Sequence, residues 1–551
     1  MNSGSRNFLI ALLIFATGTS LFFPFLGSVH LFDWDEINFA ESAREMLVTG
    51  NYARVQIDYQ PFWEKPPLFF WLQAASMHLF GVNEFAARFP NAVFGIITLL
   101  TFFFAGRKLF DTRFGIFWVL CMLGSILPFL YFKSGIIDPV FNYFIFAGFY
   151  FLILLTGKNG DQSRPFTPAL AYPLLSGMFI GLATLTKGPV ALLILMITWI
   201  VYWMSFRLRK IISLKHLLFF GISYMLTTGI WFLIVITDNG IEFFRQFIAY
   251  HIDLLTHPVA GHRGPLYYHF VIVLLGCFPM SVVALPAIIK GYREKTLFDF
   301  KRWMLILFWV VLILFTIVKT KIVHYSSLAY FPLSFLAAYA LHQGFAARAI
   351  PGWVLFILTA MSAFFSLLLF AAPLIGEHKE ILFPYLKDQF AIDCLLTDVL
   401  WKGWEKYIGI LYFLLMITAV ICLYRKYFQT GITLLFAATA FCLLIYFKAV
   451  VPKIESYSQG PAIHFYQSLR GKHVYVATFG FKSYAQYFYF RKPPGADSRS
   501  SSQEWLLKGN IDRPAYFIVK TTSMKEMEQF TEVRLIGRGG GFAFYLRNPV
   551  E

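Results

Sequence analysis

Thirteen long apolar segments constrain this chain more than any other feature of its sequence. Hydrophobic residues make up 58% of the 551 residues and the mean hydropathy is +0.62, which excludes an ordinary soluble domain. An α-helix needs roughly 20 apolar residues to cross about 30 Å of hydrocarbon, and these segments approach that length. The sequence therefore predicts a polytopic α-helical membrane protein. We place its spans at residues 8–27, 86–105, 115–132, 138–156, 170–186, 189–206, 212–236, 267–289, 303–318, 325–342, 352–374, 407–424 and 431–449.

Charged residues are distributed unequally between the two sides of these spans. With the N-terminus inside, the predicted cytoplasmic loops hold the basic residues at 107–113, 207–210, 290–302 and 425–426, which obeys the positive-inside rule. The net charge of +17 does not indicate nucleic acid, since no soluble face concentrates the basic residues. The lack of Asn-x-Ser/Thr sequences favours a bacterial membrane. We expect a monomeric, multi-pass inner-membrane protein with no nucleic-acid partner and with its C-terminus on the periplasmic side.

The composition changes after Val451, where the apolar segments end. Residues 473–478, 515–520 and 542–547 are typical of strands, and the glycine-rich stretch 537–541 predicts a turn before the last of them. We therefore divide the chain into two domains. Residues 1–451 form a transmembrane domain that includes a long outer loop at 31–84, and residues 452–551 form a small α/β domain outside the membrane.

Acidic residues gather in the outer loop directly after the first span. Asp33, Asp35 and Glu36 lie where charges are costly unless they face a cavity or a partner. Asp35 suits a helix N-cap, but a cap needs one acidic residue and three occur, so we favour a catalytic or binding carboxylate. Asp138 begins the fourth span, and there a cap followed by Pro139 and a functional carboxylate are equally supported. Apolar residues at 37, 40, 43, 46 and 47 predict an amphipathic helix on the membrane surface.

A candidate anion site follows in the same loop, at Glu64-Lys65-Pro66-Pro67. Prolines that open an apolar helix leave its first N–H groups and positive dipole end facing the preceding residues, and Lys65 adds a full charge. The alternative is a surface lysine that snorkels at the interface. Further outer-face candidates, which run against the positive-inside trend, are Lys187, Arg263, Lys319 and Lys321, with His324 and Tyr325 beside them. The histidines at 251, 257, 262 and 269 match no metal-binding spacing well.

Outer carboxylates beside a phosphate pocket suggest transfer of a sugar from a lipid-linked phosphate donor. The sequence from Asp35 to Glu41, with Glu64-Lys65-Pro66-Pro67 downstream, resembles the first outer loop of the aminoarabinose transferase and protein O-mannosyltransferase-like group of GT-C glycosyltransferases. Residues 185–188, 262–265 and 321–325 fall where that group carries similar segments, and the resemblance spans roughly residues 8–345. Asn38-Phe39 stands where the aminoarabinose enzymes usually have Arg-Tyr, a departure that bears on the donor sugar and the acceptor.

The resemblance implies a GT-C fold and a polyprenyl-phosphate sugar donor, within membrane lipids. The sugar would pass to a hydroxyl or phosphate on a lipid A-like lipid, another glycan or a protein at the outer face. No cofactor is required, although a divalent metal near Glu64 and Asp138 is compatible with this chemistry. The implied roles are catalysis by Asp35, Glu36 and Asp138; donor phosphate binding by Lys65, Lys187, Arg263, Lys321 and Tyr325; and substrate positioning by Asp33, Glu64, His262 and His324.

A transporter or flippase of an anionic polyprenyl-linked lipid is the competing interpretation, because it would use the same basic pocket. Such proteins more often contain inverted repeats and helices that break near the membrane midplane. The sequence pattern indicates neither. A pure assembly scaffold ranks third, since it would leave the carboxylate and lysine clusters unexplained.

Overall fold

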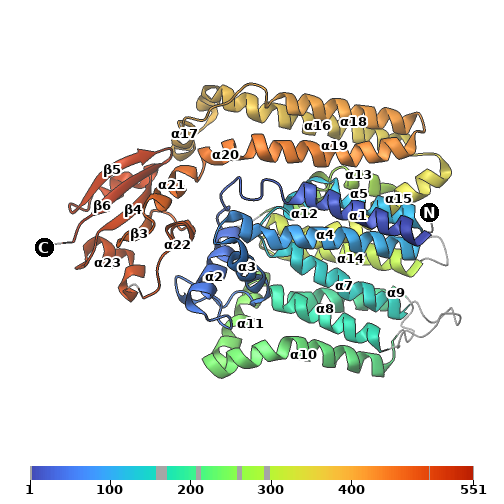
Figure 1. Ribbon diagram of the computed structural model, residues 1–551, viewed down its shortest axis with the longest axis horizontal. Coiled ribbons are helices and arrows are strands. Elements are labelled where there is room, and N and C mark those ends of the chain that lie inside the picture. Colours follow the sequence, from blue (N-terminus) through green and yellow to red (C-terminus); the bar gives the residue numbers. More distant parts are fainter. Residues whose placement is uncertain are drawn as a thin grey trace.

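The computed structural model describes residues 3–156, 170–205, 212–256, 264–290, 298–495 and 497–549. Most of these residues form a bundle of long helices, and a small domain with a β-sheet lies at one end of it (Figure 1). The N-terminus lies at the opposite end of the molecule from the C-terminus (Figure 1). The molecule is therefore a helical membrane protein with a small mixed domain, as the sequence predicts.

Every predicted span overlaps a helix. Eight helices within the described ranges are long and apolar enough to cross a membrane, or nine when a bent helix pair is counted as one span, so the total of thirteen stays a prediction. The continuous long helices are α1 (Ser3–Phe22), α4 (Glu84–Leu109), α7 (Asp138–Thr156), α8 (Ala171–Lys187), α9 (Val190–Ser205), α10 (Leu214–Asn239), α14 (Phe298–Ile317), α15 (Tyr330–Ala347), α16 (Gly352–Glu377), α18 (Tyr407–Tyr424) and α19 (Phe428–Ala449).

Two predicted spans are broken rather than continuous. Residues 115–132 fall in α5 (Thr112–Leu123) and α6 (Ile126–Tyr131), and residues 267–289 fall in α12 (Tyr268–Gly276) and α13 (Met280–Ile289). The axes of α12 and α13 are bent by 118°. The sequence pattern indicates neither of these breaks, and the pair α12 and α13 forms a broken span or a re-entrant loop.

Proline and glycine account for these breaks. Pro279 has no backbone N–H, and its ring disfavours helical geometry at Phe278. Gly124 follows α5 at a point where a Cβ atom would lie 2.4 Å from the carbonyl oxygen of Phe436. The break between α5 and α6 contacts the break between α12 and α13. The backbone N–H of Ile126 donates to the carbonyl oxygen of Phe278 at 3.0 Å.

The predicted helix after Asp35 is present, but its polar side does not face solvent as predicted. Every residue from Glu36 to Met46 is buried. Arg44 pairs with Glu41 at 2.6 Å and donates to the backbone carbonyl of Lys492, in the C-terminal domain, at 3.1 Å. The elements of the outer segments are α2 (Asp35–Thr49), β1 (Gln56–Ile57), β2 (Gln60–Pro61), α3 (Leu68–Phe80), α11 (Ile241–Thr256), η4 (Lys379–Tyr385) and α17 (Gln389–Leu395).

The C-terminal domain contains a four-stranded sheet in the order β3-β4-β6-β5, in which only β3 and β4 are parallel. All three predicted strands are present, and the sequence pattern does not predict β5. The glycine-rich stretch 537–541 forms a turn only in part, since Gly537 and Gly539 belong to β5. Glycines weaken the strand signal. The elements are α20 (Val451–Tyr457), α21 (Gly460–Ser468), β3 (Tyr475–Phe479), α22 (Ala485–Phe490), α23 (Gln503–Lys508), β4 (Ala515–Lys520), α24 (Met524–Met527), β5 (Val533–Gly539) and β6 (Phe542–Arg547).

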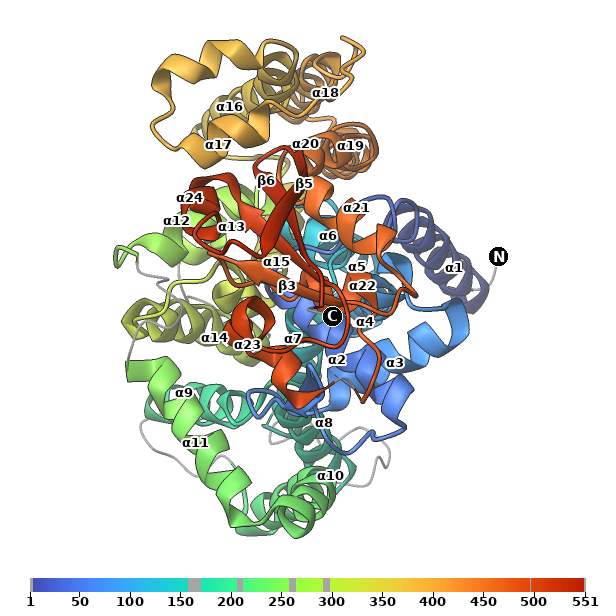
Figure 2. The same cartoon turned by 90° about the vertical axis from the view of Figure 1, so that its left-hand side faces the viewer.

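Hydrogen bonds and an ion pair connect the C-terminal domain to the loop of residues 31–84. Figure 2 shows it in front of α2 and the ends of the long helices. The backbone carbonyl of Lys492 accepts a hydrogen bond from the Tyr59 hydroxyl at 2.6 Å, and the Lys492 ammonium pairs with Asp58. The backbone N–H of Leu31 donates to the Tyr489 hydroxyl at 2.7 Å. The predicted domain boundary, between residues 451 and 452, lies at the start of α20.

The burial of α2 generates a pH-dependent prediction for Glu45. Burial and the neighbouring Glu41 carboxylate raise the pKa of Glu45 well above its ordinary value. The stability that this group contributes is therefore fully present below about pH 4.3, and it is lost as pH rises toward the folded-state pKa. We expect Glu45→Gln to remove this loss. The Tm of the variant minus the Tm of the parent should therefore increase as pH rises from about 5 to about 9.

The measurement is the thermal unfolding of purified protein in detergent across that pH range. Glu41→Gln is the matched control, since it leaves the Arg44 guanidinium buried without its carboxylate and should lower the Tm at every pH. A Tm difference between Glu45→Gln and the parent that does not change with pH would show that Glu45 is ionised in the folded protein.

The opposite placement of the two termini generates a topological prediction. An alkaline phosphatase fused after Glu551 should be active, because the enzyme folds only outside the cytoplasm and the charge pattern puts the N-terminus inside. A green fluorescent protein at the same position, exported through the Sec pathway, should be dark. Bright fluorescence with an inactive phosphatase would place the C-terminal domain in the cytoplasm.

Candidate active site

Asp35 lies at the start of α2, where the helix dipole favours a negative charge. It is not the N-cap: that position is Trp34, and no side chain caps the helix there. The Asp35 carboxylate instead lies 3.3 Å from Nε2 of His324 and is 35% exposed. Of the two readings of this residue, the capping one is thus not realised, and Asp35 stays accessible to a substrate.

Asp138 and Lys187 form the buried part of the same site. Asp138 begins α7, and its Oδ1 lies 2.5 Å from Nζ of Lys187, the last residue of α8. Gly188 follows with a φ of +98° and ends that helix. The other Asp138 oxygen, Oδ2, lies 3.9 Å from His324 Nε2 and has no hydrogen bond to any residue that the structure describes. One Asp138 oxygen therefore remains available to a ligand or a proton.

His324 joins the two carboxylates from η3 (Val323–Ala329), the short helix before α15. Burial lowers the pKa of His324, although the Asp138 and Asp35 carboxylates act in the opposite direction. The ring is therefore neutral near pH 7 and carries one N–H group. The Nε2 atom of His324 lies between the two carboxylates, 3.3 Å from Asp35 Oδ2 and 3.9 Å from Asp138 Oδ2.

Lys65 reaches the site from the residues before α3, which begins at Leu68 as predicted. Its Nζ lies 5.0 Å from the ring centroid of Tyr250 on α11, and the Tyr250 hydroxyl donates to Glu64 Oε2 at 2.7 Å. Burial lowers the pKa of Lys65; Lys187 acts in the same direction, whereas the Glu64, Asp35 and Asp138 carboxylates raise it. The Lys65 ammonium thus lies close enough to the other charged residues of the site for their charges to change its pKa.

Tyr325 follows His324 and completes the cluster. Its ring centroid lies 5.2 Å from Lys187 Nζ. The outer-face cluster is hereafter the set of Asp35, Glu64, Lys65, Asp138, Lys187, Tyr250, His324 and Tyr325, which come from six separate parts of the chain. Sequence reasoning missed Tyr250, whose only signal was its place in a long outer segment.

Three predicted site residues make other contacts. Glu36 is buried against Arg88 at 2.8 Å. The Lys321 ammonium donates to the carbonyl oxygens of Phe315, Thr316 and Val318 at 2.6 to 2.9 Å, which satisfies the end of α14. Asp33 lies against Ser483 and Tyr484 of the C-terminal domain. We leave these three out of the outer-face cluster. His262 and Arg263 lie outside the described residues.

The residues that the structure describes do not build the metal site considered near Glu64 and Asp138. No group of three or more His, Cys, Asp and Glu side chains among them is arranged to hold a metal ion. Glu64 Oε2 accepts from Tyr250 and Asp138 Oδ1 pairs with Lys187. Metal dependence therefore stays a prediction, and no step below is routed through a metal.

The cluster combines an accessible carboxylate with two cations in a partly buried setting. Such a carboxylate can accept a proton from a hydroxyl group within hydrogen-bond reach. Lysine side chains that are shielded from water stabilise developing negative charge more strongly than they do in bulk water. The arrangement suits displacement of an anionic leaving group by an oxygen nucleophile.

Comparison with known proteins relates this arrangement to characterised families. The family described as Dolichyl-phosphate-mannose-protein mannosyltransferase matches residues 64–231. The chain is 28% identical over 314 residues to the undecaprenyl phosphate-alpha-4-amino-4-deoxy-L-arabinose arabinosyl transferase of Erwinia tasmaniensis, covering 55% of this chain and 54% of that protein. The corresponding Enterobacter protein is 28% identical over 355 residues, or 62% of each chain. The match thus spans about half the length of the first of these curated relatives.

Solved structures match over the full chain. The crystal structure of ArnT from Cupriavidus metallidurans bound to undecaprenyl phosphate has a TM-score of 0.76 at 18% identity, covering 99% of this chain and 98% of that one. Its structure in the apo state has a TM-score of 0.77. The resemblance predicted from the sequence is therefore confirmed, and this chain has the fold of the aminoarabinose transferase-like GT-C glycosyltransferases.

Proposed function

We propose that this protein is an integral membrane glycosyltransferase that moves a sugar from a polyprenyl-phosphate donor to a hydroxyl or phosphate acceptor at the outer face. The observation that most directly supports this proposal is the position of the Asp35 carboxylate, which lies 3.3 Å from His324 and in one cluster with Lys65 and Lys187. The fold and the named relatives support the same reaction class. A lipid-linked donor fits a site at the end of membrane helices.

The donor phosphate binds at Lys65 and Lys187. Lys65 Nζ has no hydrogen bond to a carboxylate among the described residues, so its charge is available to an incoming anion. Lys187 holds Asp138 and lies beside the Tyr325 ring, whose hydroxyl offers a further donor. As the bond to the sugar breaks, the phosphate oxygen gains charge, and these groups stabilise it.

The acceptor binds beside Asp35. Its oxygen forms a bond to the anomeric carbon while the bond between that carbon and the donor phosphate oxygen breaks. Asp35 takes the proton when the acceptor is a hydroxyl group, and polyprenyl phosphate leaves. A phosphate acceptor is already deprotonated near neutral pH, so in that case Asp35 and His324 only orient it.

The donor to test first is undecaprenyl phosphate 4-amino-4-deoxy-L-arabinose, the substrate named for the relatives. The departure at Asn38-Phe39 does not rule it out, because both side chains are buried in α2 and Phe39 packs against Phe69 and Phe70. We propose a lipid A-like lipid as the first acceptor, with another glycan or a protein as alternatives. The proposed location is the bacterial inner membrane, with the outer-face cluster on the periplasmic side and the protein acting as a monomer.

The broken pair α12–α13 does not favour the transporter interpretation. A transport site at such a break would present ionisable groups to the substrate. The residues at this break, 276–280, are Gly-Cys-Phe-Pro-Met and carry no charge. The carboxylates and lysines that could bind an anionic substrate gather at the outer-face cluster instead.

The proposed function predicts that Asp35→Asn abolishes turnover without unfolding the protein. The amide keeps the size of the side chain but cannot act as a general base, so kcat with a hydroxyl acceptor should fall by roughly 100- to 10,000-fold. Release of undecaprenyl phosphate from the donor, with lipid A as acceptor, is followed by mass spectrometry on purified protein.

Asp388→Asn is the matched control for that measurement. Asp388 is another carboxylate of the outer segments, and it caps α17 by accepting from the backbone N–H of Phe390 at 3.0 Å. An asparagine caps a helix about as well as an aspartate, so this variant should keep the parental rate. A parental rate in Asp35→Asn with a hydroxyl acceptor would remove Asp35 from the mechanism and refute the proposed general-base step.

A further inference from the structure

We propose that the buried ion pair of Glu36 and Arg88 is a positioning device that sets the separation of the Asp35 and Asp138 carboxylates. This inference rests on the proposed function, in which those two residues belong to the reacting site. Neither Glu36 nor Arg88 belongs to the outer-face cluster. Their effect on the reaction would pass through the backbone that carries Asp35 and Asp138.

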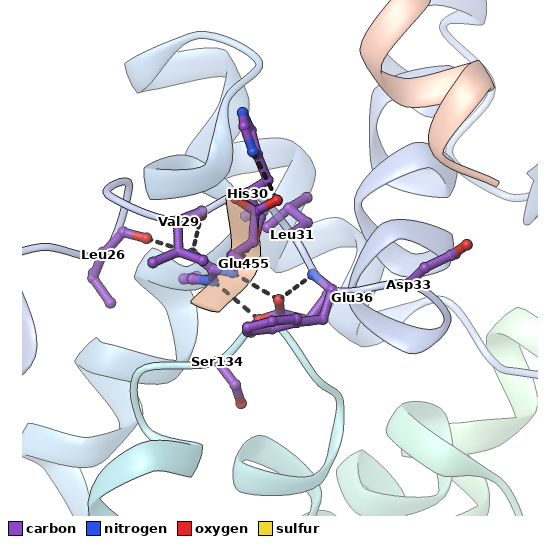
Figure 3. Close-up of polar contacts among 12 residues, drawn as sticks. Leu26, Val29, His30, Leu31, Asp33, Glu36, Ser134 and Glu455 are labelled. Atoms are coloured by element: carbon purple, nitrogen blue, oxygen red, sulfur yellow. Dashed lines mark hydrogen bonds and ion pairs between the residues drawn. The ribbon is translucent and has the colours of Figure 1, made fainter. Parts of the chain in front are cut away.

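Arg88, on α4, organises the segment that leads into α2. Its Nε donates to Glu36 Oε1 at 3.0 Å and its NH2 group donates to Glu36 Oε2 at 2.8 Å. The remaining N–H groups reach the carbonyl oxygens of Leu26 and Val29 at 2.7 Å and of His30 at 3.0 Å. In Figure 3, Leu26, Val29 and Glu36 lie around one group of dashed contacts, and Asp33 points away from it. Every N–H group of the Arg88 guanidinium therefore donates to an acceptor in residues 26–36.

Glu36 extends this organisation to the segment that leads into α7. Besides Arg88, its carboxylate accepts from the backbone N–H of Phe32 at 2.9 Å and from the backbone N–H of Gly135. Glu36 is adjacent to Asp35 in the sequence, and Gly135 lies three residues before Asp138. One carboxylate thus ties together the two segments from which Asp35 and Asp138 project.

Further contacts hold the second segment in place. The Asn91 amide on α4 donates to the carbonyl oxygens of Ser134 and Ile136 at 2.7 and 2.6 Å. The Gln73 amide on α3 donates to the carbonyl of Ala87 at 2.8 Å and to that of Gly135 at 3.4 Å. The backbone segments that carry Asp35 and Asp138 are therefore both held by hydrogen bonds to side chains of α4, from Arg88 and Asn91.

The chemistry of the pair favours positioning over stabilisation. Burying two charges carries a desolvation penalty that offsets most of their mutual attraction, so such a pair contributes little net stability. Burial raises the pKa of Glu36, but Arg88 and the N–H groups of Phe32 and Gly135 outweigh it and keep the carboxylate ionised. An ionised Glu36 accepts from all of these donors at once. A displacement of about 1 Å in a reacting group can cost about 100-fold in rate, so accurate placement has a large effect.

The C-terminal domain contains a comparison pair outside the outer-face cluster, in which the guanidinium is equally buried and the Glu532 carboxylate is 54% exposed. Arg547 donates from Nε and NH2 to Glu532 Oε2 at 2.8 and 2.6 Å, and from NH1 to the carbonyl oxygens of Leu506 and Gly509. It is 1% exposed, as is Arg88. Neutralising this pair perturbs a buried guanidinium and its carbonyl contacts without touching the segments that carry Asp35 and Asp138.

The test compares four full-length variants with the parent: Glu36→Gln/Arg88→Gln, Glu36→Asp, Glu532→Gln/Arg547→Gln and Asp35→Asn. The first double variant removes both charges together, which avoids leaving one of them buried alone. Glu36→Asp keeps the charge but shortens the side chain, so it cannot reach Arg88 and Gly135 together. We measure Tm, KM for undecaprenyl phosphate 4-amino-4-deoxy-L-arabinose, and kcat with lipid A as acceptor.

We expect kcat to fall about 100-fold in the Glu36→Gln/Arg88→Gln variant, with the donor KM within about two-fold of the parent. Glu36→Asp should show the same split between kcat and KM, with a Tm below the parental value because the shorter carboxylate leaves a buried donor unsatisfied, and it decides the test if the double variant does not fold. The Glu532→Gln/Arg547→Gln control should keep the parental kcat.

A parental kcat in both Glu36 variants, or an equal loss in the Glu532→Gln/Arg547→Gln control, would overturn the positioning role. If Asp35→Asn is inactive in that case, the proposed function stands and only the positioning role fails. Parental activity in Asp35→Asn would instead remove Asp35 from the mechanism, and a parent protein that transfers no sugar from the donor would refute the proposed function itself.

Discussion

The end of the bundle that holds the outer-face cluster depends on how charges are paired where the long helices end. Arg88 lies inside a predicted span, where an isolated guanidinium would be costly, and Glu36 together with three backbone carbonyls satisfies it. The same contacts fix the start of α2 and the segment before α7. Asp35 and Asp138 can then face His324 from two helices without being neighbours in the sequence.

The C-terminal domain contributes to the site by enclosing α2. Arg44, Tyr59 and Asp58 all contact Lys492, so the helix that begins with Asp35 is held between the bundle and this domain. The enclosure explains why α2 buries Glu41, Arg44 and Glu45 instead of presenting them to solvent. It also leaves the start of α2 half-exposed, which gives a substrate access to Asp35.

The sequence predicts much of this arrangement, and the failures have physical causes. Charges at the ends of apolar spans identified Asp35, Lys65, Asp138 and Lys187, because such charges need a cavity or a partner. The same argument pointed to Lys321, but the sequence does not indicate that its ammonium folds back onto the carbonyls of α14.

Non-local contacts and local breaks were harder to predict. The sequence does not indicate the contact between Glu36 and Arg88, because the two residues are 52 positions apart and only the fold brings them together; the catalytic role expected of Glu36 stays a prediction. A charged residue inside the span 86–105 was the signal that could have revealed the pair. The breaks at Gly124 and Pro279 lie in segments whose apolar composition alone predicts continuous spans. In the C-terminal domain, the glycines of β5 weaken the sequence signal of a strand that lies at the edge of the described sheet, next to β6.

The most direct test of the central claim is a structure of this protein with undecaprenyl phosphate bound. The phosphate should lie within hydrogen-bond distance of Lys65 Nζ and near Lys187, and the lipid should be lost in Lys65→Ala but kept when the exposed Lys472 is replaced by alanine. A groove at the other end of α4 provides the contrasting outcome: it has a volume of about 910 Å³ and is lined by Arg107, Lys108 and Asp111, among others. Lipid phosphate bound only in that groove, and unaffected by Lys65→Ala, would contradict a donor site at the outer-face cluster.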